Sequence, residues 1–91
     1  MDKLDNIVDL LNKDEVDAAI VAAESYISAS KVPDDRAYYL LGNAYRKKGD
    51  WQQAINNYLQ AIAINPDSPA QHAYDMAMDI LNFFNKDMYN Q

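Results

Sequence analysis

The only histidine of the chain, His72, stands three residues before an acid, Asp75, and this pair could suggest a metal site. A spacing of three residues places both side chains on one face of a helix. A protein zinc site needs three or four ligands, and the sequence has no cysteine to supply the others. We therefore interpret His72 as a packing or capping residue and expect no metal site.

Other residues that could carry catalysis lack the partners that catalysis needs. No nucleophile-elbow motif surrounds Ser25, Ser28, Ser30 or Ser68. The near-helical spacing of Asp2, Asp5 and Asp9 is typical of a solvated face at a helix N-terminus. No glycine-rich phosphate loop is present. We expect no catalytic residue, no cofactor and no enzymatic activity.

The composition indicates one small helical domain. Ninety-one residues, of which 49% are hydrophobic and 24% charged, suffice for a single domain with a modest core. Two glycines and three prolines are too few for a β-sandwich with many turns, and the lack of cysteine excludes a disulfide scaffold. The sequence has no long apolar run, and its first residues do not resemble a signal peptide. We expect a cytoplasmic protein that is not inserted in a membrane.

Charge is distributed unevenly along the chain. The net charge is −6, which disfavours nucleic acid as a partner because phosphate contacts need lysine and arginine. Residues 36–66 nevertheless contain four bases (Arg36, Arg46, Lys47 and Lys48) and one acid, between two acidic segments. Two interpretations remain open: this basic segment attracts an acidic partner, or its cations complement the dipole at a helix C-terminus.

Apolar spacing and capping residues predict five helices, at about 3–12, 15–30, 35–48, 51–64 and 69–84. The expected N-caps are Asp14, Asp34, Asp50 and Ser68. Pro69 fits the first position of the last helix. Gly49 follows the third helix at the position that favours a positive φ. The short connectors predict that the helices pack as antiparallel hairpins.

A pattern of aromatic, small and large apolar residues runs through residues 35–68. It consists of Tyr38, Leu41, Gly42 and Tyr45, the turn Gly49-Asp50-Trp51, and then Ala54, Tyr58, Ala61 and Pro66. This pattern resembles the 34-residue helix-turn-helix unit of the tetratricopeptide repeat family, with Tyr38 where tryptophan is commonest. The resemblance implies an all-α fold of antiparallel helix hairpins, stacked as a short right-handed α-solenoid of five helices with the last as a cap.

The repeat pattern predicts a particular contact between its two helices. Glycine in mid-helix costs about 1 kcal/mol relative to alanine, so Gly42 should be compensated by close approach of the paired helix. We expect that helix to lie opposite Gly42 at Ala54 and Tyr58, where small and large residues alternate.

The flanking segments match the family less fully. A shift of 35 residues pairs Ala54 with Ala19, and the turn Asp14-Glu15-Val16 then replaces Gly49-Asp50-Trp51. We therefore divide the single domain into a degenerate repeat at 1–34, a full repeat at 35–68, and a capping helix with a tail at 69–91.

The resemblance implies a binding function. In the family, the first helices of successive hairpins line a concave groove that holds a peptide. Helical spacing turns Tyr38, Leu41, Gly42 and Tyr45 toward the paired helix, and the opposite side then carries Arg36, Tyr39, Asn43, Arg46 and Lys47. Some family members clamp a terminal carboxylate with lysine and asparagine four residues apart; here Asn43 matches but Tyr39 stands at the lysine position. We expect an adaptor or scaffold that binds a protein or peptide, with an acidic partner favoured by the bases.

The last helix is more apolar than a cap requires. Its apolar residues either pack on the tail at Met88-Tyr89, pack within a small bundle, or form a contact surface. The candidate residues for such a surface are Tyr74, Ala77, Met78, Leu81 and Phe84. This surface motivates a second hypothesis, in which the chain associates with its own copy or extends a longer stack. We expect a monomer or a weak homodimer.

Overall fold

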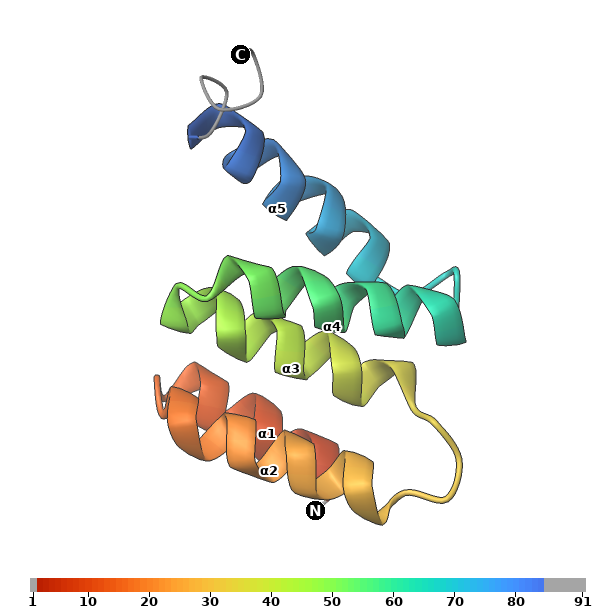
Figure 1. Ribbon diagram of the computed structural model, residues 1–91. Coiled ribbons are helices and arrows are strands. Elements are labelled where there is room, and N and C mark those ends of the chain that lie inside the picture. The colour runs from red at the N-terminus through yellow and green to blue at the C-terminus, as the bar shows by residue number, and fades with distance from the viewer. Residues whose placement is uncertain (1, 85–91) are drawn as a thin grey trace.

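The computed structural model describes residues 2–84, and within them it contains five helices and no strand. The helices are α1 (Lys3–Asn12), α2 (Val16–Ala29), α3 (Asp35–Lys48), α4 (Trp51–Ile64) and α5 (Ala70–Phe84). Their order in space follows their order in the chain, with α3 between α2 and α4 (Figure 1). The all-α fold with five helices is therefore confirmed.

Side-chain caps begin the helices where the sequence predicted them, with one exception. The amides of Arg36 and Gln53 donate to the carboxylates of Asp34 and Asp50, at 3.0 and 3.1 Å. The Ser68 hydroxyl accepts from the Ala70 amide at 3.1 Å. These bonds satisfy amides that have no partner inside the helix.

The predicted N-cap at Asp14 is wrong. Asp14 has a φ of +59°, and α2 follows Glu15 without any side-chain cap. The Glu15 amide donates to the Leu10 carbonyl at 2.9 Å, and the Asp50 amide donates to the Tyr45 carbonyl at the same distance. Asp14 is thus the counterpart of Gly49, whose φ is +90°, because each ends a helix in the left-handed conformation. The matching turns support the division into repeats that we propose.

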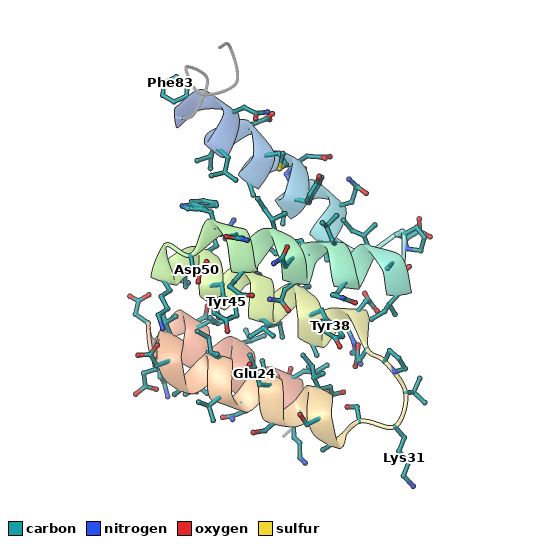
Figure 2. All side chains as sticks on the ribbon, in the orientation of Figure 1. Glu24, Lys31, Tyr38, Tyr45, Asp50 and Phe83 are labelled. Carbon is teal, nitrogen blue, oxygen red and sulfur yellow. The ribbon has the colours of Figure 1, made fainter. Side chains whose placement is uncertain are left out.

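Two apolar clusters meet at α3. The first lies between α1, α2 and α3 and includes Ile7, Ala23 and Leu41. The second lies between α4 and α5 around Tyr58, with Tyr38 and Tyr45 of α3 packed against it. Figure 2 shows Tyr38 and Tyr45 along α3. Leu41 was expected to face the paired helix, but it faces α1 and α2 because α3 is covered from two sides.

Close approach of α4 explains the glycine in the middle of α3. A Cβ atom on Gly42 would lie 2.5 Å from Cε1 of Tyr58 and 3.2 Å from the carbonyl oxygen of Ala54. Such distances are shorter than van der Waals contact, so only glycine fits here without displacement of the Tyr58 ring or of α4. The predicted contact of Gly42 with Ala54 and Tyr58 is confirmed.

The last helix runs obliquely to α4, and its C-terminal half diverges from it (Figure 1). Its buried residues are the alanines Ala70, Ala73 and Ala77, which join the second cluster. Its exposed residues are mainly polar, namely Gln71, His72, Asp75, Asp79 and Asn82, but the apolar Met76 and Phe83 are exposed as well. A largely polar outer face is what the end of a helical stack requires.

Candidate partner-binding face

The candidate face lies along α3 and comprises Arg36, Tyr39, Asn43, Arg46 and Lys47; we call these residues the α3 face. Helical periodicity places them along one side of α3. The structure brings Tyr39 and Asn43 into contact with Tyr58 of α4, and the charge of Arg46 acts on the Tyr58 phenol. The other two engage acids elsewhere.

The helical spacing predicted that Tyr39 and Asn43 lie on the side of α3 that is turned away from α4. The structure instead places both residues against Tyr58 of α4. The Tyr39 ring lies 6.2 Å from the Tyr58 ring, and the Tyr58 hydroxyl donates to Oδ1 of Asn43 at 2.6 Å. Both residues are half-buried, so they lie at the edge where α3 meets α4. The reason is that Gly42 lets α4 approach, and the long Tyr58 side chain then reaches past the glycine to the next turn of α3.

Tyr58 is a functional candidate that the sequence reasoning assigned only to the core. Its side chain is fully buried, yet it holds Asn43 in a fixed orientation through its hydroxyl. The sequence could have indicated this role through the residue type. A buried tyrosine needs a hydrogen-bond partner, whereas a buried phenylalanine does not. Since Oδ1 of Asn43 accepts this bond, its Nδ2 amide can still donate to another acceptor.

Arg46 contributes positive charge to the same group. Burial raises the pKa of the Tyr58 phenol above its ordinary value of 10.0, whereas the charge of Arg46 acts to lower it and Tyr39 adds a further rise. Tyr58 therefore stays protonated and keeps donating to Asn43. Within residues 2–84, the side chain of Arg46 forms no ion pair and no hydrogen bond, so its guanidinium can donate to a ligand.

The other three bases of the basic segment are paired with acids of the preceding segment. Arg36 binds Asp34 at 3.1 Å, Lys47 binds Asp14 at 3.2 Å, and Lys48 binds Asp17 at 3.1 Å. All three pairs are at the surface, where ion pairs contribute little stability. They nevertheless neutralise most of the excess positive charge that the sequence suggested for a partner. Neither open interpretation of the basic segment included these internal pairs.

The contact surface expected on the last helix is not continuous. Ala77 is only 1% exposed and belongs to the second cluster, so it cannot contact another molecule. Tyr74, Met78 and Leu81 are half-buried, and the side chain of Phe84 lies outside the described residues, as does the tail at Met88-Tyr89. Met76 and Phe83 of α5 are exposed apolar residues outside the expected set, and self-association stays a hypothesis.

Within residues 2–84, histidine, aspartate and glutamate side chains nowhere gather as three potential ligands. His72 and Asp75 are both exposed on α5. In the same part of the chain, every helix is too short or too polar to cross a lipid bilayer.

The structure is that of a helical repeat protein. Its helical hairpins are stacked, their turns contain Asp14 or Gly49 in the left-handed conformation, and Gly42 lies where α3 contacts α4. The family described as TPR repeat matches residues 42–73. A Bacteroides fragilis protein, BF1650, known from a solution NMR structure, is 57% identical and superposes with a TM-score of 0.89. The match covers 100% of this chain and 92% of BF1650. No curated protein matches the chain.

The chain therefore belongs to the tetratricopeptide repeat family. This family is a non-enzymatic fold that generally mediates protein–protein interactions. The matched segment starts within α3 and ends within α5, so it includes the Gly49 turn, all of α4 and three of the five residues of the α3 face.

Proposed function

We propose that the chain is an adaptor that holds an acidic segment of a partner protein on the α3 face. Tyr39, Asn43 and Arg46 are the contact residues in this proposal. Asn43 Nδ2 and the Arg46 guanidinium lie one helical turn apart, and both can donate to a carboxylate. The ring of Tyr39 adds a half-exposed aromatic surface for the apolar part of the same segment.

The observation that carries the proposal is the hydrogen bond from Tyr58 to Asn43. The hydroxyl of the buried Tyr58 donates to Oδ1 of Asn43. This bond fixes the Asn43 side chain and leaves its Nδ2 available to a ligand. A donor whose orientation is set before binding loses less rotamer entropy when the ligand arrives. Because Arg46 is the base of residues 36–66 without an ion pair in the described part of the chain, it supplies the attraction for an acid.

The proposal is tested by identifying a partner and then measuring the effect of the α3 face on its binding. Cross-linking of the tagged chain in its native cell, followed by mass spectrometry, supplies the partner and the contacting segment. Calorimetry should then show that Arg46→Gln weakens binding by about tenfold or more, because a hydrogen bond to a charged group is lost. Asn43→Ala should weaken it by a smaller factor.

Lys48→Gln is the matched control, since Lys48 is an exposed base of the same helix that lies outside the α3 face. Its affinity should equal that of the wild type. Raising the salt concentration should weaken the wild type more than Arg46→Gln. If the double variant Arg46→Gln/Asn43→Ala binds the partner as tightly as the wild type at low salt, the α3 face is not the binding site.

A further inference from the structure

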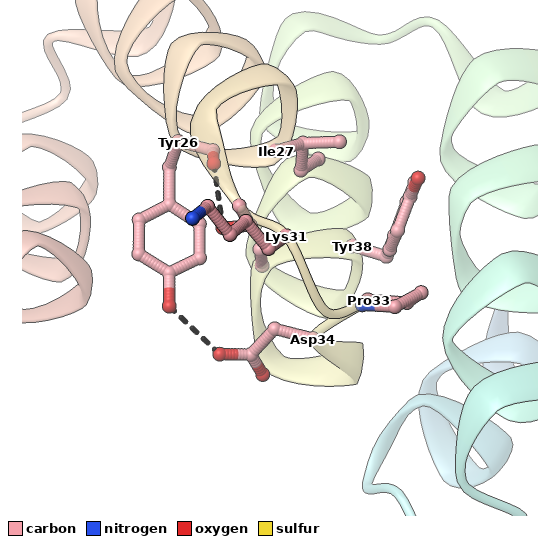
Figure 3. Close-up of a pocket in the computed structure, with 8 residues that line it drawn as sticks. Tyr26, Ile27, Lys31, Pro33, Asp34 and Tyr38 are labelled. Atoms are coloured by element: carbon pink, nitrogen blue, oxygen red, sulfur yellow. Dashed lines mark hydrogen bonds between the residues drawn. The ribbon is translucent and has the colours of Figure 1, made fainter.

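A second binding feature lies at the junction of α2 and α3, where residues 30–34 connect the two helices. A pocket of about 120 Å³ opens there (Figure 3). Its apolar lining comes from Ile27, Pro33, Ala37 and Tyr38. Since an apolar cavity of about 150 Å³ can hold benzene, this pocket has room for one branched aliphatic side chain.

The acid that lines the pocket has no capacity left for a ligand. Oδ1 of Asp34 accepts from the amide and Nε of Arg36 at 3.0 and 3.2 Å. Oδ2 accepts from the Tyr26 hydroxyl and from an Arg36 guanidinium nitrogen at 2.9 and 3.1 Å. Four donors fill the four lone-pair positions of the carboxylate, and Arg36 neutralises its charge.

The other charged group of the lining is Lys31, at the rim of the pocket. Its side chain is exposed and extends away from the connector into solvent (Figure 2). Within residues 2–84, Lys31 forms no ion pair or hydrogen bond. The lining also includes Tyr26 and Ser30, whose hydroxyls donate to Asp34 and to the Tyr26 carbonyl. The pocket therefore combines four apolar residues and internally bonded polar groups with one uncompensated positive charge at its edge. This combination is complementary to an apolar side chain followed by an acid.

We propose that this pocket binds an apolar residue and an adjacent acidic residue within a partner polypeptide. The branched side chain enters between Ile27 and Ala37, and the neighbouring carboxylate meets the ammonium of Lys31. The volume admits one side chain only, and Lys31 stands outside the pocket. The carboxylate should therefore belong to the next residue and not to the one that is buried.

This site is distinct from the part of the α3 face that contains Asn43 and Arg46. Ala37 and Tyr38 lie near the start of α3, whereas Asn43 and Arg46 lie in its C-terminal half. Arg36 does lie beside the pocket through its bonds to Asp34, so neither test uses it. Failure of the proposed function at Arg46 and failure of this inference at Lys31 can therefore be distinguished.

The test is an NMR titration of the complete 15N-labelled chain with blocked dipeptides. N-acetyl-Leu-Asp-amide should produce saturable shifts at the amides of Ile27, Lys31 and Ala37. N-acetyl-Leu-Asn-amide, of equal shape, should bind about twofold to fivefold more weakly, because only the ion pair is lost. N-acetyl-Ala-Asp-amide should bind about tenfold more weakly, because most of the buried apolar surface is lost.

Lys31→Gln should abolish the difference between the Asp and Asn dipeptides. Because Lys31 is exposed, this substitution should not unfold the chain. Lys48→Gln, at the far end of α3, should preserve that difference. The inference is overturned if the pocket amides show no saturable shift, if the three dipeptides bind equally, or if Lys31→Gln still distinguishes aspartate from asparagine.

Discussion

At the scale of single residues, Gly42 shows how one missing Cβ sets both the packing and the candidate site. Alanine at this position would gain about 1 kcal/mol of helix propensity. It would also meet the Tyr58 ring at 2.5 Å, and this ring is fully buried and held by Asn43. The steric cost of overpacking a core is about 1–3 kcal/mol, and because Tyr58 cannot rotate away we expect it to dominate. Gly42→Ala should therefore lower the free energy of unfolding, as measured by urea denaturation.

The double variant Gly42→Ala/Tyr58→Leu is the control for that prediction. Leucine removes the ring that the new methyl group would contact, so the two substitutions should be less destabilising together than the sum of their separate effects. A Gly42→Ala protein as stable as the wild type, or more stable, would mean that the close contact of α3 and α4 relaxes at little cost.

The sequence predicted the contact of Gly42 with α4 correctly, but it did not predict which residues of α3 this contact brings against Tyr58. The repeat spacing placed Gly42 against Ala54 and Tyr58, and the structure confirms this. The same spacing put Tyr39 and Asn43 on the far side, because a helical wheel gives directions but not the reach of a tyrosine side chain from another helix. The ion pair between Lys47 and Asp14 joins residues 33 positions apart, and no local pattern reports such a pair.

At the scale of the helices, the turn between α1 and α2 is held by an aspartate in a conformation that glycine adopts more readily. The φ of Asp14 is +59°, and the equivalent residue of the next repeat is glycine. Asp14→Gly should stabilise the fold by about 0.5–1 kcal/mol, and Asp14→Ala should destabilise it by about 1 kcal/mol, because a Cβ atom is unfavourable in the left-handed region.

Asp14→Asn separates the backbone effect from the loss of the contact with Lys47, since asparagine tolerates the left-handed region without a charge. Thermal unfolding should rank the variants as Gly above Asp and Asn, with Ala lowest. Equal melting temperatures for the Gly and Ala variants would contradict the role assigned to the backbone.

Asp34, in the connector between α2 and α3, should make the free energy of unfolding depend on pH in the acidic range. Partial burial disfavours the charged form of Asp34, but bonds from Arg36 and Tyr26 outweigh this and hold its pKa below the ordinary value of 3.8. A lowered pKa stabilises the folded state fully above the unfolded-state value and loses that effect as the pH falls through the folded pKa. We expect the free energy of unfolding to decline between about pH 5 and pH 3.

Asp34→Asn should reduce this decline, because asparagine cannot titrate. Asp79→Asn, on the exposed side of α5, serves as the control and should leave the slope unchanged. Urea denaturation at several pH values gives the slopes directly. Identical slopes for wild type and Asp34→Asn would show that Asp34 does not couple folding to protonation.

The helix boundaries were the part of the fold that the sequence determined best. Each apolar stripe is local, and Asp34, Asp50 and Ser68 act through amides two or three residues away. The oblique path of α5 was not foreseen, since it depends on how three alanines seat against α4. The pocket beside Lys31 was not foreseen either, because it forms only where two helices and their connector meet.

At the scale of the whole molecule, the two ends of the stack carry charge of the same sign. Exposed acids at the first end include Asp5 and Glu24, and the outer side of α5 presents Asp75 and Asp79. A head-to-tail stack of copies would bring these two ends together and place like charges opposite one another. This arrangement disfavours a stack of copies and favours a chain that works as a monomer.

Sedimentation velocity should therefore show a single species near 10.3 kDa at low ionic strength. The variant Asp75→Lys/Asp79→Lys reverses one end only, so it should associate where the wild type does not, and added salt should weaken that association. Asp67→Lys, an exposed acid outside the helices, serves as a control for a simple change in net charge. If the wild type dimerises at low salt and the double reversal leaves its dissociation constant unchanged, the ends of the stack do not govern association.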